Sequence, residues 1–172
     1  HAMSGTDYSH ITHTGVFSCL EETVNGVPIG EYGELALCAM EMGVPCIFAG
    51  GEEAFAREAE ALTPGIVSVP VKRGLQKDGL GHLDGPAYGK AKLAAIHLSH
   101  AEACRRLAEG AKSAASLLRD NPTAFQPANI KPPYIRRMMM RRSAGIPEHT
   151  LQARHENSIV GLMNLSLERV DA

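Results

Sequence analysis

Two apolar runs separated by one helical stretch constrain the fold more than any other feature of the sequence. Residues 44–49 are apolar and end at Gly50 and Gly51, residues 52–62 are acidic and alanine-rich as is typical of a helix, and residues 66–71 are apolar again. Two parallel strands cannot be joined by a tight turn, so a helix between two strands indicates a crossover and a buried parallel pair. The sequence therefore predicts an α/β fold, with a mixed or parallel sheet and flanking helices.

A hairpin and a helix are predicted before this unit. Asn25-Gly26 lies between two short extended runs in residues 16–29, and such a dipeptide favours the tight turn of a β-hairpin. In residues 31–42 apolar side chains recur every three or four positions, and Gly43 supplies a C-terminal stop. We therefore expect a strand pair followed by a helix that begins at Glu31.

The second half of the chain has its own series of signals. We expect a mobile glycine-rich loop over residues 74–89 and a long helix over residues 91–118. A linker punctuated by prolines follows over residues 122–133. Two strands, residues 134–142 and 150–155, and a closing helix, residues 158–167, complete the chain. Residues 1–125 are predicted to form the main part of one domain, and residues 126–172 its closing strands and helix.

Charge and hydropathy exclude several classes of partner. The chain has 17 basic and 19 acidic residues among 172, a formal charge of −2, so no overall field attracts nucleic acid or anionic lipid. The basic cluster at residues 136–142 has no interleaved aromatic residues, and it is better explained as a half-buried strand with solvated arginines. No apolar run approaches the ~20 residues that cross a bilayer. We expect neither a nucleic-acid partner nor a membrane partner.

The cysteine pattern indicates a reducing compartment. The four cysteines are widely spaced and form no Cys-x-x-Cys pair. Disulfides are rare in the cytosol, so free cysteines of this kind favour a cytoplasmic protein.

Three histidines and one glutamate are the candidates for chemistry. His1, His10 and His13 crowd the first thirteen residues, and imidazole is both the commonest metal ligand and the usual general base near pH 7. The same spacing is common among exposed polar residues, and His1 is also explained as a tag remnant. Glu31, at the predicted helix start, suits either an ordinary capping charge or a metal ligand. From spacing alone the ordinary roles are favoured.

One stretch of the chain is similar to a known family. Residues 24–36 combine Asn25-Gly26 with Gly30-Glu31-Tyr32-Gly33 at a helix start, and Gly43-Val44-Pro45 follows. With these motifs the chain resembles the D-aminopeptidase family of dinuclear zinc peptidases over nearly its whole length.

The resemblance implies roles for three residues. The glutamate of the family's Gly-Glu-x-Gly motif is a zinc ligand and corresponds to Glu31, and the zinc-binding histidine that opens another family segment corresponds to His1. A catalytic histidine lies in a Ser-His-Ser or Ser-His-Thr context shortly before a phenylalanine, which Thr12-His13-Thr14 before Phe17 matches. His13 is therefore the catalytic candidate. One extra residue between His1 and His13 leaves His10 as the alternative.

The resemblance also implies an activity. We expect a zinc-dependent aminopeptidase that hydrolyses short peptides with N-terminal D-amino acids, such as D-alanyl peptides, and that holds two zinc ions in a homo-oligomer. Zinc lowers the pKa of bound water toward ~7, and a nearby histidine would move protons or steady the developing oxyanion.

Part of the family pattern is not found in this sequence. The family begins with a strand that bears an Asp-x-Glu zinc-binding pair and supplies another histidine, and neither precedes His1. We therefore expect a fold that lacks these N-terminal strands, an inactive 172-residue chain, and an N-terminal segment as its partner. The alternative is a non-catalytic oligomerising or peptide-binding scaffold that has lost metal ligands.

Overall fold

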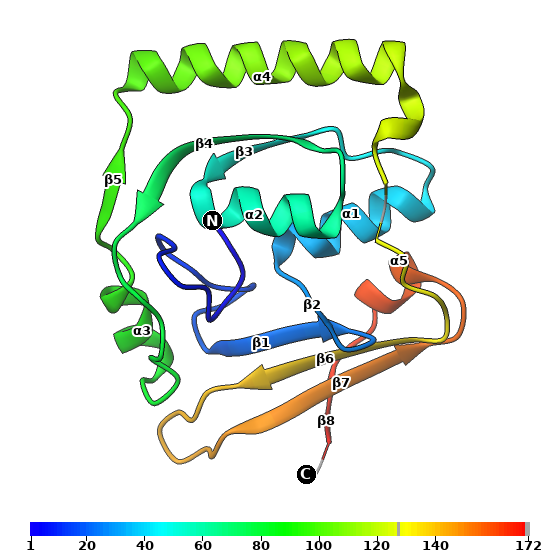
Figure 1. Cartoon of the computed structure of the whole chain (residues 1–172). Helices are drawn as coiled ribbons and strands as arrows, with labels where there is room; N and C mark the ends of the chain where they lie inside the picture. The colour runs from blue at the N-terminus through cyan, green and yellow to red at the C-terminus, as the bar shows by residue number, and fades with distance from the viewer. Residues whose placement is uncertain (127, 171–172) are drawn as a thin grey trace.

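The chain forms two sheets with helices between and above them (Figure 1). The computed structural model describes residues 1–126 and 128–170, so Pro127 of the predicted linker lies outside the described residues. The larger sheet has the order β2-β1-β6-β7-β8 and is antiparallel throughout. Its strands are β1 (Cys19–Val24), β2 (Val27–Pro28), β6 (Tyr134–Met140), β7 (His149–His155) and β8 (Glu168–Val170).

The smaller sheet contains the predicted crossover. Strand β3 (Phe48–Glu52), helix α2 (Glu53–Leu62) and strand β4 (Val67–Gly74) follow in order, and β3 and β4 pair in parallel, which confirms the predicted unit. β5 (Ala95–His97) joins antiparallel to β4, so the sheet is mixed. The α/β prediction is confirmed.

Helix α4 (His100–Asp120) covers this sheet because small residues let it approach closely. A Cβ added at Gly110 would lie 2.3 Å from Val69 Cγ2 of β4, and one added at Gly50 would lie 2.5 Å from Leu107 Cδ2 of α4. Side chains at either glycine would push the helix off the sheet.

The predicted hairpin and the helix after it support the larger sheet. β1 and β2 pair across Asn25-Gly26, and α1 (Glu31–Glu41) begins at the expected residue. The main core lies between α1, the larger sheet and α5 (Ile159–Met163), with Leu37, Val24 and Leu162 nearly inaccessible to solvent. α1 is thereby fixed at its N-terminal end, where Glu31 stands.

Three sequence predictions were wrong in their extent. Residues 91–118 are not one helix, because α3 (Gly85–Ala91) ends there and β5 intervenes before Ser99 caps α4. Residues 74–89 are not a loop throughout, because Asp84 caps α3 within them. The closing helix stops at Met163 and is followed by β8. A three-residue strand is too short to show the alternation of apolar and polar residues that indicates a strand, so the sequence did not predict β5 or β8.

The arginines of the basic cluster are also not all solvated as predicted. Arg136 has a side chain only 12% exposed and pairs with Glu22 of β1 at 2.7 Å and with Glu34 of α1. Arg141 is buried, stacks on Tyr88 at 3.8 Å from the ring centroid and donates to backbone carbonyls. Arginine tolerates burial when its fixed donors are satisfied. Across residues 1–126 and 128–170, no helix has the length and apolar character that a membrane span requires.

Candidate metal centre

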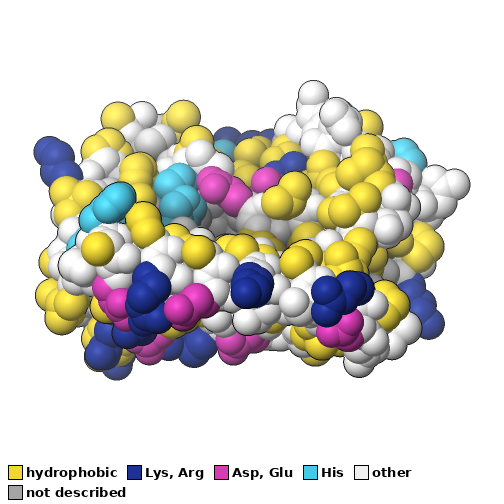
Figure 2. Space-filling view, turned by 90° about the horizontal axis from the view of Figure 1, so that it is seen from above, with side chains coloured by type: hydrophobic (Ala, Val, Ile, Leu, Met, Phe, Trp, Pro, Cys, Tyr) yellow, Lys and Arg dark blue, Asp and Glu magenta, His cyan; other side chains and the backbone are white. Residues whose placement is uncertain are grey.

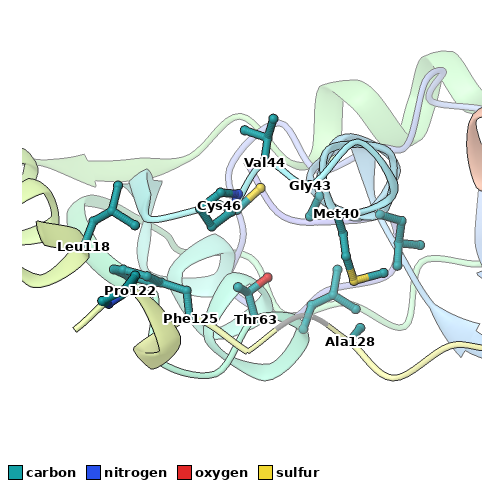
Figure 3. Close-up of a pocket in the computed structure, with 13 residues that line it drawn as sticks. Met40, Gly43, Val44, Cys46, Thr63, Leu118, Pro122, Phe125 and Ala128 are labelled. Atoms are coloured by element: carbon teal, nitrogen blue, oxygen red, sulfur yellow. The ribbon is translucent and has the colours of Figure 1, made fainter.

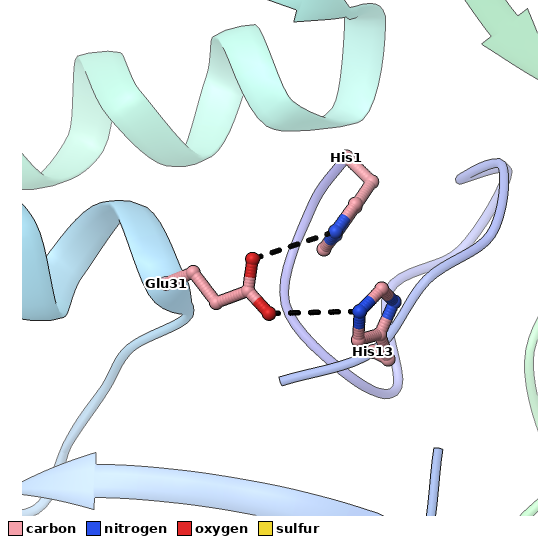
Figure 4. A group of neighbouring side chains, drawn as sticks. All are labelled: His1, His13 and Glu31. Carbon is pink, nitrogen blue, oxygen red and sulfur yellow. Dashed lines mark ion pairs between the residues drawn. The ribbon is translucent and has the colours of Figure 1, made fainter. Parts of the chain in front are cut away.

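Two imidazoles and one carboxylate meet where the N-terminal loop touches the start of α1 (Figure 4). His1 Nε2 lies 3.6 Å from Glu31 Oε2, and His13 Nε2 lies 3.5 Å from Glu31 Oε1. The two imidazole rings stack with centroids 4.1 Å apart. One ligand atom from each residue lies within 4.8 Å of the others. Among the described residues this is the one group of three with that geometry.

Both imidazoles are oriented by their second nitrogen. His1 Nδ1 lies 3.2 Å from the carbonyl oxygen of Ala2, and His13 Nδ1 lies 2.7 Å from that of Ile11. A carbonyl accepts the proton of Nδ1, so the neutral ring keeps a lone pair on Nε2, which faces Glu31. Histidine ligands of metals are held in this way.

The three donors fit a metal ion such as zinc. Two donors at ~2.1 Å from one tetrahedral ion are about 3.4 Å apart, close to the observed N to O separations of 3.5 and 3.6 Å. A catalytic zinc site typically has three protein ligands of the imidazole and carboxylate type, with a fourth position for water or substrate. Glu31, with a side chain 44% exposed, leaves this position accessible.

Glu52 holds the N-terminal loop from the end of β3. Its side chain is fully buried and accepts the N–H of Ala2 at 2.6 Å, the N–H of His10 at 2.5 Å and the hydroxyl of Ser9. A buried carboxylate is tolerated when several donors satisfy it. Glu52 therefore fixes the backbone next to His1 and that of the loop that leads to His13.

Glu58 of α2 connects the two segments that bring the candidate ligands together. It accepts the N–H of Met3 at 2.7 Å. The same carboxylate lies against Gly30, where an added Cβ would come within 2.8 Å of both Glu58 Oε1 and Met3 Cβ. Burial raises the pKa of Glu58, and the bond from Met3 opposes this shift. Glu58 thus ties the residues beside His1 to the residue before Glu31.

A buried lysine anchors the other side of the loop. Lys92 is fully buried, pairs with Asp78 at 3.0 Å and donates to the carbonyl oxygen of Thr6 at 2.8 Å. Its own carbonyl accepts the N–H of Ile11 at 2.8 Å. Tyr88 donates to Asp78 and accepts from the N–H of Gly5. The segment from Asp78 to Lys92 therefore holds residues 5–11 in place.

Ile11 carries backbone strain beside the site. Its φ of +50° lies in the left-handed region, which is unfavourable for a β-branched residue. The carbonyl of this residue accepts the bond that orients His13. On its other side His13 packs against Phe17, with ring centroids 4.7 Å apart. Strain that persists where the surroundings fix it is typical of functional sites.

The structure brings His1, His13 and Glu31 together and leaves His10 outside the group. His10 instead lies against Lys72 and His97. Sequence reasoning missed Glu52, Glu58 and Lys92, which hold the loop. Their partners in the N-terminal loop lie between 42 and 86 residues away in the chain, and a contact over such a separation leaves no local pattern.

An apolar cavity of about 380 Å³ lies elsewhere, at the ends of α1, α2 and α4 (Figure 3). Met40, Leu118 and Phe125 are among its lining residues. None of the described residues that line it is a histidine or a carboxylate. It therefore has no group of the kind found at the metal centre.

The α/β scaffold brings two imidazoles and one accessible carboxylate together at a spacing that suits a metal ion. The chain belongs to the D-aminopeptidase family, because the family model of that description matches residues 1–151. A comparison with curated protein sequences gives no match.

The fold is similar to that of one solved peptidase. It matches the Zn-dependent D-aminopeptidase DppA from Bacillus subtilis, a self-compartmentalizing protease, with a TM-score of 0.67 and 20% sequence identity. The match covers 96% of this chain and 62% of the DppA chain. The chain thus spans less than two thirds of the length of that relative.

Proposed function

We propose that this chain carries part or all of the active site of a zinc-dependent aminopeptidase for short peptides with N-terminal D-amino acids, such as D-alanyl peptides. The observation that carries this proposal is the meeting of His1, His13 and Glu31 in a chain of the D-aminopeptidase family. The zinc dependence named for DppA supports the choice of metal.

Each residue of the centre has a separate role. His1 and Glu31 would hold the ion, since their atoms face each other at 3.6 Å and the carboxylate provides the anionic ligand. Zinc, when bound, supplies a Lewis acid and a bound water of lowered pKa. We assign His13 to proton transfer at Nε2 and not to the ion, because its Nδ1 is engaged by the Ile11 carbonyl. The third protein ligand of the ion is then a residue other than His13.

A dinuclear centre and a homo-oligomer complete the proposal. A second zinc ion, when bound, would supply a further Lewis acid for the substrate amine or the scissile carbonyl. The second ion needs donors besides His1, His13 and Glu31. The description of DppA as self-compartmentalizing supports assembly of several copies of this chain, which light scattering on the purified protein would measure.

The first experiment replaces the anionic ligand. In the complete protein, with the N-terminal segment present, Glu31→Gln should reduce bound zinc, measured by elemental analysis, and abolish hydrolysis of D-alanyl-D-alanine while the fold persists, because the neutral amide is a poor ligand. Glu109→Gln, an exposed glutamate on α4, is the matched control and should change neither quantity. Unchanged zinc content and turnover in Glu31→Gln would exclude this residue from the centre.

The second experiment separates catalysis from metal binding at His13. His13→Ala should keep zinc and lose most of the turnover, because a proton-transfer group acts mainly in the transition state. His10→Ala should have a milder effect on turnover. Loss of zinc in His13→Ala would instead place His13 among the ligands, and the opposite ranking of the two variants would move the catalytic role to His10. Zinc binding without turnover in the complete wild-type protein would favour a non-catalytic scaffold.

A further inference from the structure

Three basic side chains outside the group of His1, His13 and Glu31 form a second cluster: Lys72, His10 and His97. Lys72 Nζ lies 3.3 Å from His10 Nδ1, and the rings of His10 and His97 meet edge to face with centroids 5.4 Å apart. Lys72 and His97 are paired residues on the neighbouring strands β4 and β5. The side-chain nitrogen atoms of residues from the N-terminal loop, β4 and β5 thus lie close together.

The cluster is cationic and has no anionic partner of its own. Among residues 1–126 and 128–170, no carboxylate lies within ion-pair distance of Lys72, although the side chain is partly buried. The nearest acidic group in the sheet register is Glu52, whose oxygens already accept from Ala2, Ser9 and His10. The charge of the cluster is that of the Lys72 ammonium, because burial and the neighbouring Lys72 lower the pKa of His10. An ammonium with hydrogen-bonding imidazoles beside it favours the binding of an anion.

The position of the cluster connects it to the metal centre. Glu52 and Lys72 are neighbours near the carboxyl ends of the parallel strands β3 and β4, which is where ligands bind in open α/β sheets. The N–H groups of Ala2 and His10 bind the two oxygens of the same Glu52 carboxylate. Figure 2 shows histidine and acidic side chains gathered beside a hollow on the upper face. The buried Glu52 carboxylate therefore contacts both the backbone of His10, in the cluster, and the backbone of Ala2, next to His1.

We propose that Lys72, His10 and His97 bind the C-terminal carboxylate of a short peptide whose N-terminal residue lies at the metal centre. The inference rests on the proposed function and names its substrate class: peptides with a free carboxylate close to the scissile bond. An extended dipeptide spans ~7 Å, so its two charged ends would lie at neighbouring sites. Long peptides and peptide amides would lack this contact.

The kinetic test compares D-alanyl-D-alanine with its C-terminal amide in the complete, zinc-loaded protein with the N-terminal segment present. Lys72→Met should raise KM for the free dipeptide roughly tenfold to a hundredfold with little change in kcat, because a charge-assisted contact that persists through the reaction is lost. The same variant should leave the kinetics of the amide unchanged. Lys72→Arg keeps the charge and should recover most of the loss. Lys112→Met, at an exposed lysine on α4, is the matched control.

A binding experiment tests the cluster independently of catalysis. The imidazole nitrogen resonances of His10 and His97 should shift when D-alanyl-D-alanine is added, should respond weakly to its amide, and should not respond to the dipeptide in Lys72→Met. Carboxylate-dependent shifts in a complete protein that shows no hydrolysis would support the binding site and reject the proposed activity. Equal hydrolysis and equal shifts with the peptide and the amide would overturn the inference and leave the proposed activity standing.

Discussion

Residues 1–17 and the strand pair β6 and β7 are ordered by different means. The N-terminal loop has no helix or strand apart from an isolated bridge between Thr14 and Val16, and buried charged groups hold it from several sides. β6 and β7 pair over their full length, from Tyr134 opposite His155 to Met140 opposite His149. The loop carries the candidate chemistry, and the strands carry none of it.

The difference lies in how the stabilising contacts are shared. In the strand pair each residue adds a ladder bond or a side-chain contact of modest value, so no single residue decides the structure. In the loop a few carboxylates and one lysine each satisfy two or three partners, and removing one leaves several buried groups unpaired. We therefore expect single substitutions to have large effects in the loop and small effects in the strands.

The largest effect is expected at Lys92. Lys92→Met removes the cation from a fully buried pair and leaves Asp78 without its ion-pair partner, which should lower the free energy of unfolding by about 3–5 kcal/mol. Chemical denaturation would measure this loss. The double variant Lys92→Met with Asp78→Leu removes both charges and should recover a substantial part of it. A loss below about 1 kcal/mol in the single variant would mean that the loop does not depend on this pair.

The next effect is expected at Glu52. Glu52→Gln keeps the shape but turns one acceptor oxygen into a donor, so the amide cannot accept from both Ala2 and His10. The free energy of unfolding should fall by about 2–3 kcal/mol, and zinc affinity should fall with it because His1 loses its support. Glu53→Gln, at the exposed neighbouring carboxylate, is the control. Equal stability of the two variants would contradict a special role for Glu52.

The sequence predicted the strands better than the loop for the same physical reason. The crossover, the hairpin and the strands at β6 and β7 arise from local patterns of apolar residues and turn residues. His1, His13 and Glu31 were assigned through a family resemblance, and the structure brings them together. The residues that hold them, Glu52 and Glu58, had no local signal, since each partner lies about 40 to 55 residues away in the chain.

The larger sheet also contains a buried ionisable side chain, that of Glu22 on β1. Burial raises the pKa of Glu22 to about 7 from an ordinary value of 4.5, although Arg136 lowers it. The folded state therefore binds a proton more tightly than the unfolded state, and its stability should fall as pH rises from about 4.5 to about 7. The neighbouring groups are Arg136 and Glu34.

Glu22→Gln tests this dependence. The variant cannot titrate at this position, so its stability curve should lack the decline, which we expect to be on the order of 2 kcal/mol between pH 5 and 7. Denaturation at a series of pH values would measure both curves. Parallel curves for the variant and the wild type would show that another group causes the decline, and a wild-type curve that rises over this range would contradict the raised pKa.

The smallest effect is expected at Arg137, which completes the comparison on the same strand as Arg136. Arg137 is exposed and donates to the side chain of Gln152 across β6 and β7 at 2.8 Å. A solvated cross-strand bond competes with water on both sides, so Arg137→Ala should change the free energy of unfolding by less than about 0.5 kcal/mol. The flanking ladder and the buried Met138 remain unchanged. A loss comparable with that of Lys92→Met would mean that the strands depend on single charged contacts as the loop does.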